Sequence, residues 1–394
     1  MKRQLLIAVL ITSILMFTAC SESDIPIIGD TSSATVQETS NPSDTGSETT
    51  VPVSTGTVTE KVETTVKVET TVKEETSTNE VTTETEEPKE TDNDKVIFED
   101  PLFVLPKEGV RPVAVIIDNG GSGPLPQGGP GLAQIVYEIL VEGGITRLMP
   151  IYWALDIELI GPVRSARHYF LDYMKEYDSY FVHYGWSPQA KNDIYNLGIQ
   201  VANGVSNAYS IFWDLTKQKN NWQDTYTKSK NIESIMKNFG YSFETNINAA
   251  VYFNTEWTVP DIGEPCSSLK IKYSNAYNVS YIYDPQIGMY FRYQQGKPHM
   301  ERNNGEQIQA GNIIIMRVKN YTIAGDTEGR QEFETIGSGK GYYITSGKII
   351  EIIWSKKDRF SPTIFKDTDD NIITYNPART YIQVVPLDYG IEYE

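Results

Sequence analysis

The chain has 394 residues and a formal net charge of −18 at pH 7, and it contains only two cysteines and three histidines. This charge argues against a nucleic-acid partner, because binding to phosphates needs clustered Lys and Arg side chains. The three histidines show none of the spacings of a zinc site, and two cysteines are too few for a disulfide framework. We therefore expect no nucleic acid and no metal.

The first twenty residues, MKRQLLIAVLITSILMFTAC, have the pattern of an export signal. Lys2 and Arg3 precede an apolar stretch that ends in Thr-Ala-Cys, and this order resembles the signal of bacterial lipoproteins. Cys20 is then the lipidation site, which leaves Cys266 without a disulfide partner; the alternative is an ordinary signal peptide with a chance cysteine. We expect an extracytoplasmic protein, lipid-anchored to the cell membrane. Because no nucleotide pool exists there, we also expect no cofactor.

Residues 21–95 form a low-complexity segment rich in Thr, Glu, Ser and Val. The segment has 18 acidic residues and five lysines, and it contains the hexapeptide VETTVK at 62–67 and again at 68–73. A composition so poor in aromatic residues cannot bury enough apolar surface to offset the chain entropy. We interpret the segment as a disordered acidic tether that carries most of the net charge.

Residues 96–249 alternate apolar strand-like runs with helical patterns. This alternation indicates an N-terminal α/β domain with a mixed sheet and flanking helices. The expected strands cover 113–117, 147–153 and 180–184. The expected helices cover 132–142, 165–177 and 228–239. Ser165 is the expected N-cap of the second of these helices.

Residues 250–394 contain short aromatic and β-branched runs separated by Gly, Asn and Asp, a pattern typical of antiparallel strands. The expected strands cover 269–273, 279–283, 289–293, 312–318, 341–345, 349–354 and 380–385. GSGKG at 337–341 lacks the spacing of a phosphate-binding loop and is interpreted as a turn. The predicted fold class is α+β, with the α/β domain followed by a mostly antiparallel β domain.

Two glutamates four positions apart are candidate catalytic acids. On the expected helix over 132–142, Glu138 and Glu142 lie on the same flank of the apolar face. Neighbouring carboxylates raise each other's pKa when they are partly buried, as a general acid requires. Asp118, at the end of the first expected strand, is a further candidate. The alternative is a solvated flank on which Glu142 pairs with Arg147.

The motif GPVRSAR places Arg164 and Arg167 around an expected helix start. Cations at a helix N-terminus oppose the macrodipole, so a negative group should lie nearby. Within the fold that group is Glu138, Glu142 or Asp118. It is otherwise an anionic group of a ligand, such as a carboxylate or a phosphate. The sequence leaves both alternatives open.

The stretch VHYGWSPQA follows another expected strand and contributes His183, Trp186 and Gln189. Ligands of α/β sheets bind near the carboxyl ends of strands, where Asp118 and Asn119 also lie. Aromatic rings beside hydrogen-bonding groups suit the faces of sugars. A purely structural histidine at the strand end is the alternative.

Six stretches occur in a characteristic order between about residues 98 and 385: RPVAVIIDN, AQIVYEILVEGGITR, GPVRSAR, HYGWSPQA, GSGKGYYITSGK and NPARTYIQVV. Together they resemble the YerB-like lipoproteins of Gram-positive bacteria. The resemblance implies an N-terminal and a C-terminal domain and no settled activity. One position departs from the family pattern, because Gln223 stands where relatives carry histidine before a Tyr-Thr pair. If that histidine is essential in the relatives, this protein is altered or inactive.

Two functions fit these residues. The first is a peptidoglycan glycosidase or lytic transglycosylase in which Glu142 or Glu138 protonates the glycosidic oxygen. Asp118 is then a second carboxylate or positions the substrate. The remaining substrate-binding candidates are Asn119, Arg147, Arg164, Arg167, His183, Trp186 and Gln189. The second function is a non-catalytic surface module that binds wall polymer or a partner protein, with the arginines and glutamates in a buried ion-pair network.

Overall fold

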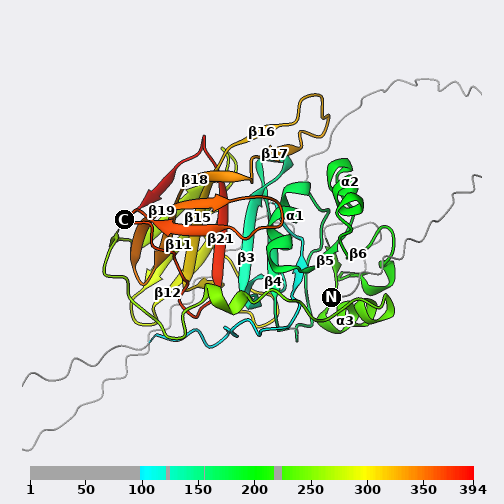
Figure 1. The fold of residues 1–394 in the computed structure, drawn as a ribbon, viewed down its shortest axis with the longest axis horizontal. Helices are drawn as coiled ribbons and strands as arrows, with labels where there is room; N and C mark the ends of the chain where they lie inside the picture. Colours follow the sequence, from blue (N-terminus) through cyan, green and yellow to red (C-terminus); the bar gives the residue numbers. More distant parts are fainter. Residues whose placement is uncertain (1–97, 121–124, 155, 217–223) are drawn as a thin grey trace, which may run out of the picture. The chain divides into compact units, whose positions relative to one another are not determined.

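The computed structural model describes residues 98–120, 125–154, 156–216 and 224–394. The predicted signal with Cys20, the acidic segment and Gln223 lie outside these residues. Within them, no helix is both long and apolar enough to cross a membrane. The fold class is α+β, as the sequence predicts, with a mixed sheet in the first half and mostly antiparallel strands in the second (Figure 1).

Among the described residues, one mixed sheet has twelve strands and runs through both halves of the chain. Its strands from the first half are β1 (Val113–Val115), β2 (Ile117–Asn119), β3 (Ile135–Leu140), β4 (Thr146–Tyr152), β5 (Tyr180–His183) and β6 (Val201–Asn203). Its strands from the second half are β9 (Glu264–Pro265), β15 (Asn312–Val318), β18 (Gly337–Thr345), β19 (Lys348–Lys356), β20 (Ile364–Asp367) and β21 (Thr380–Pro386). The main path is β20-β19-β18-β15-β21-β3-β4-β1-β5-β6, while β2 pairs with β4 and β9 with β19.

The two halves of the large sheet meet at β3. This strand pairs in parallel with β21, from Ile135 opposite Thr380 to Ile139 opposite Val384. On its other side β3 pairs antiparallel with β4, and all six of its residues are buried. A strand covered on both faces has an almost continuous apolar sequence rather than an alternating one. IVYEIL therefore forms a central strand.

The helix predicted over 132–142 is wrong. Two short 3-10 turns, η1 (Pro130–Leu132) and η2 (Glu142–Gly144), flank β3 in its place. The apolar residues match a helical face only because nearly every position is apolar, and the β-branched residues among them favour a strand. Glu138 and Glu142 consequently do not share a helix flank.

A second sheet has six antiparallel strands among the described residues. They are β10 (Ser268–Lys272), β11 (Asn278–Asp284), β12 (Met289–Gln294), β13 (Lys297–Pro298), β14 (Gln309–Ala310) and β22 (Ile391–Tyr393). Their order is β13-β12-β11-β10-β22, and β14 pairs with β12. This sheet packs against the large sheet, because Tyr273 and Arg292 bond to Glu138 of β3 and Tyr281 accepts a hydrogen bond from Gln383 of β21.

Three helices lie near the β5–β6 end of the large sheet in Figure 1: α1 (His168–Met174), α2 (Pro188–Asn196) and α3 (Ser229–Asn238). The helix predicted over 165–177 begins only at His168 and continues as the 3-10 helix η3 (Lys175–Tyr177). Ser165 is not its N-cap, since the Ser165 hydroxyl donates to the carbonyl of Tyr184 at 2.9 Å. The helix α2 is absent from the sequence prediction, although Ser187 caps it and a proline follows at its first position.

The remaining elements are short. Two hairpins pair β7 (Trp213–Asp214) with β8 (Thr225–Tyr226) and β16 (Asn320–Thr322) with β17 (Gln331–Phe333). Two further 3-10 helices are η4 (Tyr209–Ile211) and η6 (Ala249–Tyr252). GSGKG at 337–341 is not a turn but the first half of β18. The seven strands predicted after residue 250 are confirmed, each within one or a few residues of its expected ends.

Candidate functional site

Glu138, the first candidate acid, is sealed inside the protein with no exposed surface. Its Oε2 accepts a hydrogen bond from Arg292 at 2.8 Å, and Arg292 is equally buried. Its Oε1 accepts from Asn119 at 3.0 Å and from Thr146 at 2.8 Å. A polymer cannot reach this carboxylate, and Asn119 is buried with it.

The side chains around Glu138 form a closed ring of hydrogen bonds, which we call the Glu138 ring. Arg292 Nε donates to His299 Nδ1 at 2.9 Å, so His299 Nε2 carries the proton and donates to Gln127 at 2.7 Å. Gln127 donates to Asn119 at 2.8 Å, and Asn119 donates back to Glu138. Burial and then the charge of Arg292 lower the pKa of His299 well below its usual range, which keeps the imidazole neutral.

Glu142, the second candidate acid, lies between two arginines. Its Oε2 accepts from Arg167 Nε at 2.9 Å, its Oε1 pairs with Arg167 Nη2, and Arg147 Nη2 approaches Oε1 at 3.2 Å. Burial favours the neutral acid, but the hydrogen bond from Arg167 and the charges of both arginines outweigh it and lower the pKa of Glu142 to about 2. The carboxyl group is therefore ionised at neutral pH and has no proton to donate. Glu142 does pair with Arg147, as the alternative predicted, but the pair is largely buried and lies on no solvated helix flank.

Asp118 is the partner of Arg164. Arg164 Nε donates to Asp118 Oδ2 at 2.6 Å and Nη2 pairs with the same oxygen, while Oδ1 accepts from the backbone of Gly120. Burial lowers the pKa of Arg164, and the charge of Asp118 acts against that effect. Both arginines of the GPVRSAR motif thus have acidic partners within the fold, which is one of the two predicted alternatives.

The third predicted group, after β5, is mainly structural. His183 is fully buried, and its Nδ1 donates to the carbonyl of Gly185 at 2.7 Å. Burial lowers the pKa of His183 to about 4, so the ring is neutral at pH 7. The ring of Trp186 packs on the imidazole of His183, with the ring centroids 5.6 Å apart. The buried Oε1 of Gln189 has no hydrogen-bond partner among the described residues.

A cleft of about 470 Å³ opens beside this group, and Arg164 is the predicted site residue that lines it. We call it the Arg164 cleft. It lies between the chain segments that follow β5 and β6 and the hairpin of β7 and β8. The lining residues are Val163, Arg164, Ser165, Tyr184, Gly185, Val205, Tyr209, Phe212, Trp213, Asp214 and Thr225.

Four aromatic residues form the walls of the Arg164 cleft: Tyr184, Tyr209, Phe212 and Trp213. Tyr184 meets the edge of Phe212 with ring centroids 5.4 Å apart. Its ring also lies against Gly204, where a Cβ atom would stand 2.0 Å from the ring, so any larger residue would displace it. Tyr209 projects into solvent with 73% of its surface exposed. The cleft therefore combines three features. The guanidinium of Arg164 is largely buried, the ring of Tyr184 is fixed by packing, and the ring of Tyr209 is exposed to solvent.

Among the residues that line the cleft, the sequence predicts Arg164 as a site residue but not the aromatic residues. Tyr209, Phe212, Trp213 and Asp214 lie in a single stretch, YSIFWD, whose aromatic density was an available signal. The signal was weak, because 25 tyrosines are spread through the chain. Arg147 and Arg167 pair with Glu142 and are not among the residues that line the cleft.

Two family models match the chain. The model described as "Protein of unknown function (DUF3048) N-terminal domain" matches residues 105–242, and the corresponding C-terminal domain model matches residues 269–382. The chain belongs to the DUF3048 family. Every residue that lines the Arg164 cleft lies within the match to the N-terminal domain of this family.

The relatives of this DUF3048 protein include a protein named "Putative lipoprotein YerB" from Bacillus subtilis (strain 168). It is 33% identical over 282 residues, which cover 70% of this chain and 81% of the relative. A crystal structure of the YerB protein from Bacillus subtilis matches with a TM-score of 0.63 and 30% identity, over 75% of this chain and 99% of that one. The resemblance to YerB-like lipoproteins is confirmed.

Proposed function

We propose that this DUF3048 protein is an extracytoplasmic lipoprotein, anchored through Cys20, that binds cell-wall glycan in the Arg164 cleft without cleaving it. The sequence around Cys20 and the name of the Bacillus subtilis relative support the anchor. The observation that carries the proposed binding is the cleft itself, which is lined by four aromatic residues and by an arginine that already has an acidic partner.

Peptidoglycan presents the groups that this cleft suits. A pyranose ring has an apolar face, and Tyr and Trp side chains combine an apolar ring with a polar tip. Tyr209 supplies the accessible ring, and Arg164, whose Nε and Nη2 pair with Asp118, lines the same cleft.

The states of the three candidate acids favour binding over cleavage. A glycosidase needs a carboxylic acid that is protonated near neutral pH beside the scissile bond. Glu138 is sealed, Glu142 has a pKa of about 2, and Asp118 is bonded to Arg164. The non-catalytic module is therefore the better of the two predicted functions. A protein partner on the cell surface remains the alternative occupant of the same cleft.

The test is sedimentation of the purified full chain, in a mild non-ionic detergent, with insoluble peptidoglycan. Tyr209→Ala should weaken binding roughly five- to tenfold, the value expected for one exposed stacking ring. Tyr321→Ala is the matched control, because Tyr321 is half exposed on β16 and lies outside the cleft lining. Equal binding by the Tyr209 variant and the wild type would reject the cleft.

The same samples test for cleavage. Mass spectrometry of the supernatant should find no released glycan fragments, since Glu138 is sealed, Glu142 is ionised and Asp118 is bonded to Arg164. Fragments that appear with the wild type and vanish with Glu142→Gln would restore the enzyme hypothesis and identify its acid.

A further inference from the structure

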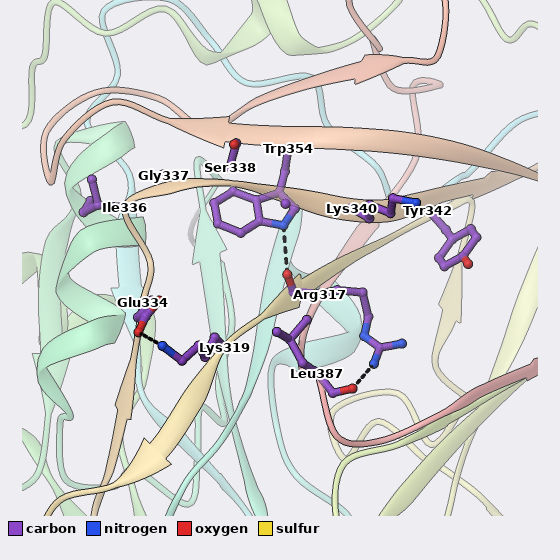
Figure 2. A pocket seen from close by; sticks show the side chains of 11 residues that line it. Arg317, Lys319, Glu334, Ile336, Gly337, Ser338, Lys340, Tyr342, Trp354 and Leu387 are labelled. Atoms are coloured by element: carbon purple, nitrogen blue, oxygen red, sulfur yellow. Dashed lines mark hydrogen bonds and ion pairs between the residues drawn. The ribbon is translucent and has the colours of Figure 1, made fainter.

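The second half of the large sheet contains a groove where one long hairpin splits (Figure 2). The two arms of the hairpin are β15 with β16 and β17 with β18. They pair on one side of the split, where Met316 lies opposite Gly341, and again on the other side, where Asn320 lies opposite Phe333. Between these pairs the short segment 317–319 faces the longer segment 334–340. The longer segment bows away and leaves a cavity of about 560 Å³.

The split leaves one edge of β18 open toward the groove. Residues 337–340 pair with β19 on one side, from Gly337 opposite Lys356 to Lys340 opposite Ile353. On the groove side, no described strand pairs with them, and there they form no backbone hydrogen bond with another part of the chain that the structure describes. An open strand edge presents donors and acceptors at the spacing of another strand.

Trp354 of β19 connects the two arms at the groove. Its indole Nε1 donates to the carbonyl oxygen of Arg317 at 3.1 Å, a contact drawn in Figure 2. Gly339 makes room for this ring, because a Cβ atom there would stand 2.7 Å from Nε1. Trp354 is itself 3% exposed and offers no free face on which a sugar could stack.

The groove is lined by more cations than anions, in contrast to the acidic chain as a whole. Glu334 pairs with Lys319 at 2.6 Å. Arg317 and Lys340 form no ion pair with any residue that the structure describes, and Arg317 Nη2 instead donates to the carbonyl of Leu387 at 2.6 Å. The buried Nε of Arg317 has no hydrogen-bond partner among the described residues.

We propose that this groove binds a short acidic peptide segment, which pairs as a strand with residues 337–340 of β18 and is no longer than this stretch, because the hairpin closes on both sides of the split. The peptide backbone completes the hydrogen bonds of the edge, and its carboxylates face Arg317 and Lys340. Ile336, which is 41% exposed at the end of the groove, contacts an apolar side chain of the peptide. This site is separate from the Arg164 cleft and shares no lining residue with it.

The experiment measures the fluorescence anisotropy of a labelled peptide of alternating valine and glutamate added to the full chain in detergent. We expect saturable binding, and at least a tenfold loss when alternate peptide nitrogens of the probe are methylated, because methylation removes its backbone donors. Absence of binding by the unmodified peptide would overturn the proposal. Equal binding by both peptides, or stronger binding by an inorganic polyphosphate, would replace strand addition with simple attraction of anions.

Variants locate the site. Lys340→Glu should weaken the binding of the acidic peptide roughly fivefold or more, and Ile336→Asp should weaken it through repulsion and lost apolar contact. Lys297→Glu, an exposed lysine on β13 outside the groove, makes the same charge change and should leave binding unchanged. An equal loss in the Lys297 variant would show that net charge rather than the groove controls binding.

Discussion

Glu142 shows how neighbouring charges decide the chemistry of one residue. Its carboxylate accepts hydrogen bonds from Arg147 and Arg167, and its pKa in the folded protein is about 2 rather than the ordinary 4.5. A group with a lowered folded pKa contributes stability that is fully present above its unfolded pKa. That contribution is lost as the pH falls through the folded pKa. This cluster therefore stabilises the fold at neutral pH and weakens in acid.

We predict that Glu142→Gln lowers the free energy of unfolding by about 2 kcal/mol at pH 7, because two largely buried arginines lose their counter-charge. The difference from the wild type should shrink as the pH falls from 4.5 toward 2, where Glu142 itself becomes protonated. Urea unfolding across this range measures it. Glu158→Gln is the control, because the exposed Glu158–Lys228 pair is screened by solvent and should matter far less. A difference independent of pH would contradict the proposed role of the charge.

The sequence predicted part of this chemistry and missed the rest for a physical reason. Two arginines near an expected helix start demand an acidic group nearby, and the Asp118–Arg164 and Glu142–Arg167 pairs confirm that expectation. No local rule pairs Glu138 with Arg292, because the two residues are 154 positions apart and belong to different sheets. Such a pair depends on tertiary packing, so periodicity does not reveal it.

At the scale of elements, β3 is the strand on which both sheets depend. It pairs with β4 and β21 in the large sheet, and through Glu138 it holds Arg292 of β12 in the second sheet. Its sequence was interpreted as a helix because a run that is apolar at nearly every position satisfies both periodicities. A strand that is exposed on one face, such as β10, alternates buried and exposed residues, and its sequence predicts it correctly.

We predict that Arg292→Met destabilises the protein by about 3–5 kcal/mol, because it leaves Glu138 buried without its counter-charge. Glu138→Gln combined with Arg292→Met should recover part of this loss, since the double variant leaves no uncompensated charge. Urea unfolding of the two single variants and the double variant gives the coupling energy. If the effects of the single variants simply add, the Glu138 ring is not a coupled unit.

At the scale of the whole molecule, the change of composition near residue 249 does not coincide with a break in the large sheet. The family models match residues 105–242 and 269–382, yet β3 of the first region pairs with β21 of the second along most of its length. Local sequence patterns predict the secondary-structure class of each half. They do not predict which strand pairs with an internal strand, because that pairing joins residues that are far apart in the sequence. The shared sheet is the part of the architecture that only the structure reveals.

This shared sheet predicts that the two halves unfold together. Separating them would expose the edge of β3 and its buried residues, and would leave Glu138 without Arg292. Urea unfolding of the full chain, followed by tryptophan fluorescence and by far-ultraviolet circular dichroism, should therefore give one coincident transition. A fragment of residues 98–249 should lack cooperative unfolding on its own, because it contains β3 without β21. Two separate transitions in the full chain, or a cooperatively folded fragment, would show that the halves are independent domains that merely align their strands.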